Sequence, residues 1–211
     1  MVKSMKQLIE ERKKMNPVGK VIIVEGCDLS GKSTLVELLQ KHYPSLTIKD
    51  TTRPKDDSFE ERRKKKATYM SIFNFLHDNP LRTIILDRYF PSELVYSKVK
   101  RGYEAFNDLE YRDLQEMLLR MDQEVFIIIC KPPIETILDR YKKRGDDYIK
   151  EDDVAEIMER YETFYEETKL SVLNVDTRNT REDLLKEVIS FIEHDYKAPV
   201  NEPKQKELPL K

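Results

Sequence analysis

The amino-acid sequence predicts an α/β fold: a five-stranded parallel sheet flanked by helices. Three observations lead to this. Short apolar runs alternate along the chain with segments of helical periodicity, which is typical of parallel strands joined by crossover helices. The first apolar run, 20–25, leads into a glycine-containing loop and then a helix. A chain of 211 residues is also long enough to bury one full core as a single domain.

Each element is expected from its own local pattern. The run at 125–130 is continuously apolar, which fits an interior strand, and Pro132-Pro133 ends it and starts the next helix. The expected strands are 20–25, 46–50, 82–87, 124–130 and 171–176, and the expected helices are 31–42, 58–78, 91–101, 107–121, 133–143, 151–169 and 180–195. We divide the chain into an N-terminal helical extension (1–18), a main domain (19–196) and a disordered tail (197–211).

Composition excludes several classes of protein. The 38 basic and 40 acidic residues nearly cancel, giving a formal net charge of −2, so no overall field favours nucleic acid or an anionic membrane. The two cysteines, Cys27 and Cys130, have no metal-site spacing and favour a reducing compartment. No apolar run is long enough to span a membrane, and no signal-peptide pattern is present. We therefore expect a cytoplasmic protein.

The loop after the first strand carries the strongest functional signal. Gly26 to Ser33 reads GCDLSGKS and fits the phosphate-binding pattern G-x-x-x-x-G-K-[ST]. Gly26 and Gly31 allow the backbone N–H groups to turn inward onto phosphate oxygens, and the following helix directs its positive end to the same point. Lys32 is expected to reach the transferring phosphates and Ser33 to ligate Mg²⁺. The plainer alternative is a glycine turn before an ordinary helix.

A second cluster follows the third expected strand. Asp87 lies at the carboxyl end of that strand, where ligands bind in open α/β sheets, and a carboxylate there can hold the Mg²⁺ shell. Arg88 has a guanidinium suited to a second phosphate group. The alternative for the two residues is an ordinary surface ion pair.

Together these pieces resemble the thymidylate kinase family of P-loop kinases. The resemblance rests on Glu25-Gly26-Cys27-Asp28, Thr52-Arg53-Pro54 and Asp87-Arg88-Tyr89, followed by Ser92 and Val95-Tyr96, and it covers roughly residues 19–195. It implies a three-layer P-loop NTPase sandwich of the nucleoside-monophosphate-kinase type, with ATP and Mg²⁺ as cofactors. In that family Arg53 and Arg88 would hold the acceptor's 5′-phosphate, Asp28 would approach its 3′-hydroxyl, and Tyr96 would pack near the sugar or base.

The resemblance also implies a lid over about 140–153. Arg140, Lys143 and Arg144 end a helix there, and one of these cations would cover the donor phosphates. Leu29 stands where some family members have an arginine, so that task falls to the lid. Arg178 would border the adenine. The full set expected to bind ATP is Gly26, Asp28, Leu29, Ser30, Gly31, Lys32, Ser33, Thr34 and Arg178.

The acceptor region departs from the family pattern. Thr52-Arg53-Pro54 lacks the family's glutamate, and a single long helix, 58–78, stands where two are usual. Phe73 is a candidate base contact on this helix, although helical spacing makes core packing the plainer explanation. The basic run 62–66 is either a solvated face or a grip for phosphate or nucleic acid.

These observations favour transfer of the ATP γ-phosphoryl group to a thymidylate-like deoxynucleoside monophosphate. Glu25 leaves open a hydroxyl acceptor, either a deoxynucleoside or a hydroxymethylated pyrimidine in a nucleotide or in DNA, because it matches the catalytic base of related deoxynucleoside kinases. A non-catalytic nucleotide-binding switch and a kinase with another small-molecule acceptor are further alternatives. The partner we expect is a nucleotide substrate. Family members are often homodimers, but no interface signature is evident in the chain.

Overall fold

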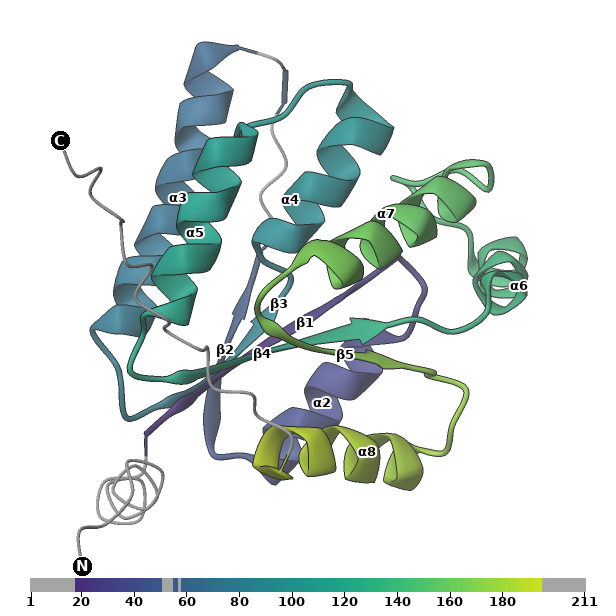
Figure 1. The fold of residues 1–211 in the computed structure, drawn as a ribbon. Coiled ribbons are helices and arrows are strands. Elements are labelled where there is room, and N and C mark those ends of the chain that lie inside the picture. Colours follow the sequence, from purple (N-terminus) through teal and green to yellow (C-terminus); the bar gives the residue numbers. More distant parts are fainter. Residues whose placement is uncertain (1–17, 51–54, 57, 195–211) are drawn as a thin grey trace, which may run out of the picture.

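The computed structural model describes residues 18–50, 55, 56 and 58–194. Its centre is a five-stranded sheet in the order β2-β3-β1-β4-β5 (Figure 1). All four strand pairings are parallel. The strands are β1 (Lys20–Gly26), β2 (Ser45–Lys49), β3 (Thr83–Asp87), β4 (Glu124–Cys130) and β5 (Ser171–Val175). The predicted fold class is confirmed.

Helices cover both faces of the sheet, as the predicted layers require. The helices are α2 (Lys32–His42), α3 (Phe59–His77), α4 (Phe90–Tyr96), α5 (Asp108–Leu119), α6 (Ile134–Arg144), α7 (Asp153–Glu167) and α8 (Arg181–His194). Helices α2 and α8 pack on one face, while α3, α4, α5 and α7 pack on the other (Figure 1).

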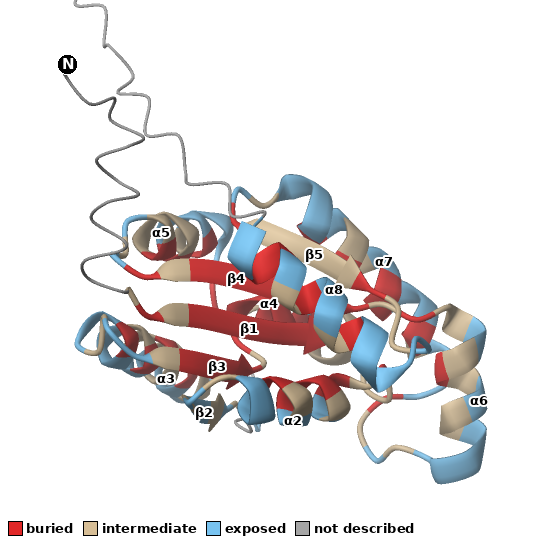
Figure 2. Ribbon diagram, turned by 90° about the horizontal axis from the view of Figure 1, so that it is seen from below, coloured by how far each residue is buried: buried red, intermediate tan, exposed pale blue. Residues whose placement is uncertain are grey.

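The middle strands are buried on both faces, which explains their continuous apolar runs (Figure 2). Alternate residues of β1 point into different cores. Val21 and Ile23 contact the core beneath α3, α4, α5 and α7, whereas Ile22 and Val24 contact the one beneath α2 and α8. The sheet order sets β1 between β3 and β4, so the loop that follows β1 emerges at the centre of the sheet's carboxyl edge.

One predicted helix is divided in the structure. The segment expected as a helix over 91–101 forms α4, which ends at Tyr96, and then a five-residue π-helix, η1 (Ser97–Arg101). Gly102, with φ 70°, closes η1 and donates its N–H to the Ser97 carbonyl at 2.9 Å. The hydrophobic spacing did not reveal the wider turn, because a π-helix adds only one residue to an otherwise helical pattern.

Both terminal segments lie outside the described residues. Most of the predicted helical extension (1–18) and the 197–211 tail fall there, as does Thr52-Arg53-Pro54. No helix among the described residues has the length and apolar character needed to cross a bilayer.

Candidate active site

A cavity of about 830 Å³ opens at the carboxyl edge of the sheet, where the loops after β1, β3 and β5 meet. It has two ends, which take the names donor end and acceptor end from the roles that the sequence predicts. The donor end is formed by Asp28, Leu29 and 31–34 together with Thr177 and Asn179. The acceptor end is formed by side chains of α3 and of the α4–η1 segment. Arg140, Arg144, Asp146 and Tyr148 of the predicted lid also line the cavity.

The loop after β1 has the backbone geometry that its glycines predict. Gly26 has φ 134° and Gly31 has φ 100°, both in the region that favours glycine. A Cβ on Gly26 would lie 2.6 Å from the Cys130 carbonyl oxygen, and one on Gly31 would lie 3.0 Å from Thr177. Helix α2 begins directly after Gly31, so its unpaired N–H groups face the cavity. Such a loop can bind phosphate through its backbone.

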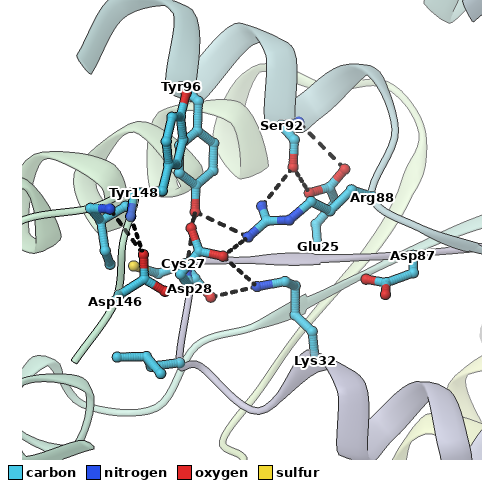
Figure 3. Close-up of polar contacts among 12 residues, drawn as sticks. Glu25, Cys27, Asp28, Lys32, Asp87, Arg88, Ser92, Tyr96, Asp146 and Tyr148 are labelled. Carbon is cyan, nitrogen blue, oxygen red and sulfur yellow. Dashed lines mark hydrogen bonds and ion pairs between the residues drawn. The ribbon is translucent and has the colours of Figure 1, made fainter. Parts of the chain in front are cut away.

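Lys32 lies folded back onto this loop (Figure 3). Its ammonium donates to the Cys27 carbonyl at 2.6 Å and stands 4.0 Å from an Asp28 carboxylate oxygen. Burial, together with the nearby positive charge of Arg88, lowers the pKa of Lys32 to about 8. A phosphate bound in the loop would bring further negative charge beside this buried lysine.

The predicted Mg²⁺ residues both line the donor end. Asp87 closes β3, is 7 % exposed, and forms an ion pair with Lys49 at 3.5 Å. Ser33 is exposed at the start of α2. Within the described part of the chain no group of three or more carboxylate, histidine or cysteine side chains is arranged for a metal ion. One hydroxyl and one carboxylate nevertheless fit Mg²⁺, which keeps several waters and takes its remaining ligands from substrate phosphates.

Arg88 joins the two ends of the cavity. Its φ of 74° is unusual for a residue with a side chain, and its N–H is held by the Val24 carbonyl at 3.1 Å. The guanidinium donates to Asp28 at 2.6 Å, to Ser92 at 2.9 Å and to the Tyr96 hydroxyl at 3.2 Å (Figure 3). Asp28 in turn accepts from Tyr96 at 3.0 Å. Burial favours the neutral acid, but the charges of Arg88 and Lys32 outweigh it and lower the pKa of Asp28.

Glu25 does not line the cavity, and its surroundings argue against a role as catalytic base. The side chain is fully buried, and its two oxygens accept hydrogen bonds from the Tyr89 N–H at 2.8 Å, the Ser92 hydroxyl at 2.5 Å and the Tyr161 hydroxyl at 2.9 Å. Burial raises its pKa despite the charge of Arg88. Glu25 links β1, α4 and α7 and does not line the cavity, so its role as catalytic base stays a prediction that this geometry does not favour.

The predicted lid touches the phosphate loop. Arg140 donates to the Leu29 carbonyl at 2.8 Å, which brings a lid cation to the position where Leu29 replaces a loop arginine. Leu29 itself has φ 65°. Beyond α6, Asp146 accepts from the N–H groups of Tyr148 and Ile149, and the Tyr148 ring stacks on Tyr96 with centroids 5.9 Å apart. The lid segment therefore contacts both ends of the cavity.

Several predicted site residues lie elsewhere. Phe73 packs against the core and stacks on His77 at 6.3 Å, so the structure does not bring it to the cavity. Arg178 is exposed and paired with Asp176 at 2.6 Å, and Thr177, Asn179 and Arg181 line the cavity in its place. Gly26 and Ser30 are buried and do not line the cavity. Arg53 is outside the described residues.

Sequence reasoning missed two ion pairs that line the acceptor end. Lys65, from the basic run, is buried and bonded to Asp50 at 2.7 Å, while Glu93 of α4 is bonded to Arg101 of η1. The Tyr69 hydroxyl also donates to Asp50 at 3.0 Å. Nothing in the basic run 62–66 distinguishes the buried Lys65 from its exposed neighbours. Glu93 could have been found, because it directly follows Ser92 in the segment that carries the family resemblance.

Comparison with known proteins gives the same fold. No protein-family model matches the chain. A prophage-derived uncharacterized protein of Bacillus subtilis, YorR, is 28% identical over 176 residues, which is 82% of this chain and 99% of YorR. The crystal structure of YorR in complex with phosphorylated GDP superimposes with a TM-score of 0.65 at 26% identity, covering 83% of this chain and 97% of that structure.

Two structures with lower sequence identity share the same fold. Deoxyadenosine kinase from M. mycoides, with the products dCMP and dCDP, has a TM-score of 0.56 at 19% identity and covers 82% of this chain and 98% of its own. Thymidylate kinase from Candida albicans has a TM-score of 0.57 at 19% identity and covers 84% of this chain and 92% of its own. The chain thus has the fold of P-loop nucleotide kinases. The specific resemblance to thymidylate kinase is not distinguished from resemblance to other nucleotide kinases.

Proposed function

We propose that this protein transfers the γ-phosphoryl group of ATP to the 5′-phosphate of a deoxynucleoside monophosphate. The observation that carries the proposal is one continuous cavity lined at one end by a loop with the phosphate-binding sequence pattern and at the other by Arg88, Tyr96 and two buried ion pairs. A site for ATP alone would not need the second end. The likeness to YorR, whose structure holds phosphorylated GDP, and the shared fold of nucleotide kinases support nucleotide substrates.

The chain's own residues would hold the donor as follows. The loop N–H groups and Lys32 bind the β and γ phosphates, while Thr177 and Asn179 lie toward the nucleoside. Ser33 and Asp87 would hold Mg²⁺, which neutralises charge on the donor phosphates when it is bound. Arg140 and Arg144 bring positive charge from the lid side, where negative charge spreads over the transferring group.

The acceptor would be held by Arg88. Its guanidinium lies between Asp28 of the loop and Ser92 of α4, so a phosphate bound there faces the donor site. Because catalysis of phosphoryl transfer depends mostly on alignment and charge, a rigidly held arginine at the junction fits that task. The anchoring of Arg88 by Asp28, Ser92 and Tyr96 supplies this rigidity.

A phosphate acceptor is favoured over a hydroxyl acceptor by the state of Glu25. A neutral hydroxyl needs a base within hydrogen-bond reach, whereas a phosphate is already ionised. Glu25 uses its oxygens on Tyr89, Ser92 and Tyr161, and it is fully buried. Sequence resemblance suggests thymidylate as the acceptor, but the base itself would be selected by residues at the far end of the cavity.

The test is an acceptor screen with γ-labelled ATP and Mg²⁺, using deoxynucleoside monophosphates, free deoxynucleosides, and plain and hydroxymethyluracil-containing DNA. Label in a deoxynucleoside diphosphate supports the proposal. Label only in nucleosides or DNA would replace it with a hydroxyl kinase. ATP turnover that no acceptor changes would replace it with a nucleotide switch.

A further inference from the structure

The acceptor end of the cavity carries an ion pair that the phosphate chemistry does not use. Glu93 of α4 and Arg101 of η1 both line the cavity and are bonded through Oε1 and Nη2. Their side chains are 3 % and 10 % exposed. Because burying a charged pair costs solvation free energy, a pair retained in a cavity wall points to a use for its polar atoms.

The two residues lie on the same face because of the π-helix. In a regular α-helix, residues seven apart lie on one face, so the partner of Glu93 would be Lys100. The wider turn of η1 shifts the face by one residue and brings Arg101 to Glu93, eight positions on. Lys100 instead turns to Asp153 of α7. This local distortion of the helix is thus what assembles the pair.

Both partners keep unused hydrogen-bonding capacity. Among the described residues the only hydrogen bond between side chains at this pair joins Nη2 of Arg101 to Oε1 of Glu93. Nε of Arg101 is buried with no hydrogen-bond partner there. The second carboxylate oxygen of Glu93 is likewise left to accept. The pair therefore offers a carboxylate acceptor beside guanidinium donors, a short distance along α4 from the Arg88–Ser92 contact.

From this arrangement we infer that Glu93 and Arg101 read the edge of the acceptor's base and select a base with an exocyclic amino group. Cytosine, adenine and guanine each present an amino donor together with an acceptor nitrogen or oxygen, matching the carboxylate and the guanidinium. Thymine and uracil have carbonyls on both sides of their single N–H, and these carbonyls would repel the carboxylate. The inference rests on the proposed function and replaces thymidylate with an amino-bearing nucleotide as the preferred acceptor.

The experiment compares matched acceptors that differ in the amino group. For the wild-type protein we expect kcat/KM to favour dCMP over dUMP, and dGMP over dIMP, by about 10-fold or more. In Glu93→Gln, whose amide both donates and accepts, the ratio should fall toward one, with KM for the acceptor changing more than KM for ATP. Arg101→Lys should weaken every acceptor. Lys98→Ala, on η1 but outside this cavity, is the control and should keep the wild-type ratio.

Calorimetric binding of the same four nucleotides separates the two proposals. If no monophosphate receives phosphate but dCMP still binds more tightly than dUMP, the proposed function fails and the base selection stands. Preference for dUMP over dCMP or for dIMP over dGMP, no binding of any monophosphate, or a Glu93→Gln ratio within about twofold of wild type would overturn the inference. Thermal unfolding of each variant shows whether the loss of the pair has altered the fold.

Discussion

The donor and acceptor ends of the cavity are built in opposite ways. The donor end is built mainly on one continuous segment, the loop after β1 and the start of α2, with residues after β3 and β5 completing it, and it relies on backbone N–H groups and one buried lysine. The acceptor end brings together residues that follow β2 and β3 with side chains of α3, α4 and η1, and it relies on the ion pairs Lys65–Asp50 and Arg101–Glu93, with Arg88–Asp28 at the junction of the two ends. At the donor end the positive charge of Lys32 is available to a bound phosphate. At the acceptor end the positive charges of the arginine and lysine side chains are largely balanced by carboxylates.

This difference separates affinity from selectivity. A backbone cradle with a cation binds phosphate strongly but cannot distinguish one nucleotide from another. Paired charges in a cavity wall add little net attraction, yet they penalise any ligand that does not match their hydrogen-bonding pattern. The donor end should therefore dominate the rate, and the acceptor end should dominate the choice of substrate. The following substitutions test that division.

The largest effect is expected from the donor end. Lys32→Ala should reduce kcat by about 10³-fold, because the loop loses its only side-chain cation at the transferring phosphates. Initial-rate measurements with saturating acceptor check this. Lys41→Ala, on the exposed side of α2, is the matched control and should retain wild-type activity. A Lys32→Ala protein that keeps a tenth of the activity would contradict the assignment of the donor site.

Arg88→Ala tests the junction between the ends. We expect about a 100-fold loss in kcat/KM for the acceptor and a much smaller change in ATP affinity, because the proposed function places the acceptor phosphate at Arg88. Steady-state kinetics with each substrate varied in turn measure the two effects. Arg120→Ala, an exposed arginine after α5, is the control. Equal losses for both ligands would remove Arg88 from the acceptor site.

Glu25→Gln should lower the free energy of unfolding by about 1–3 kcal/mol, since a buried acceptor of several hydrogen bonds is replaced by a group that fits them less well. The midpoint of urea unfolding should fall with an unchanged slope. Activity per folded molecule should fall much less than in Lys32→Ala. If Glu25→Gln is stable but loses as much activity toward a hydroxyl acceptor as Lys32→Ala does, the result would support Glu25 as the catalytic base.

A smaller effect is expected from pH. The pKa of Lys32 is lowered to about 8 in the free protein, so its charge is lost as pH rises above 8 and ATP should bind more weakly, by at most about tenfold per pH unit. The contribution of Lys32 to the free energy of unfolding changes with pH in the opposite direction to ATP affinity. Between pH 8 and 10.5 the unfolded chain binds more protons, so this contribution rises with pH.

Calorimetry of ATP binding between pH 7 and 9 measures this effect, together with the proton taken up. In Lys32→Ala the uptake should vanish. Uptake that persists in the variant would assign the titration to another group.

Local sequence patterns predicted most of the fold and the backbone geometry of the loop after β1. The strand, loop and helix around Gly26 to Ser33 are contiguous in the sequence, so the spacing of their residues was enough to predict how they are arranged. The acceptor end depends on which side chains meet across separate elements. Nothing in the sequence indicated that Lys65 would be buried on Asp50, or that a π-turn would bring Arg101 to Glu93. Phe73 and Arg178 were reasonable candidates for contacts with a base. In the structure, however, Phe73 packs against the core and Arg178 is held by an ion pair with Asp176, so neither lines the cavity.

The central claim is that donor and acceptor nucleotides occupy one cavity at the same time. A bisubstrate analogue, adenosine joined through five phosphates to a deoxynucleoside, tests this directly by calorimetry. We expect one molecule to bind per chain, at least about 100-fold more tightly than ATP, because one ligand gains both sets of contacts without a second loss of freedom. The gain should shrink in both Lys32→Ala and Arg88→Ala. Binding no tighter than that of ATP, or insensitive to Arg88→Ala, would contradict the account.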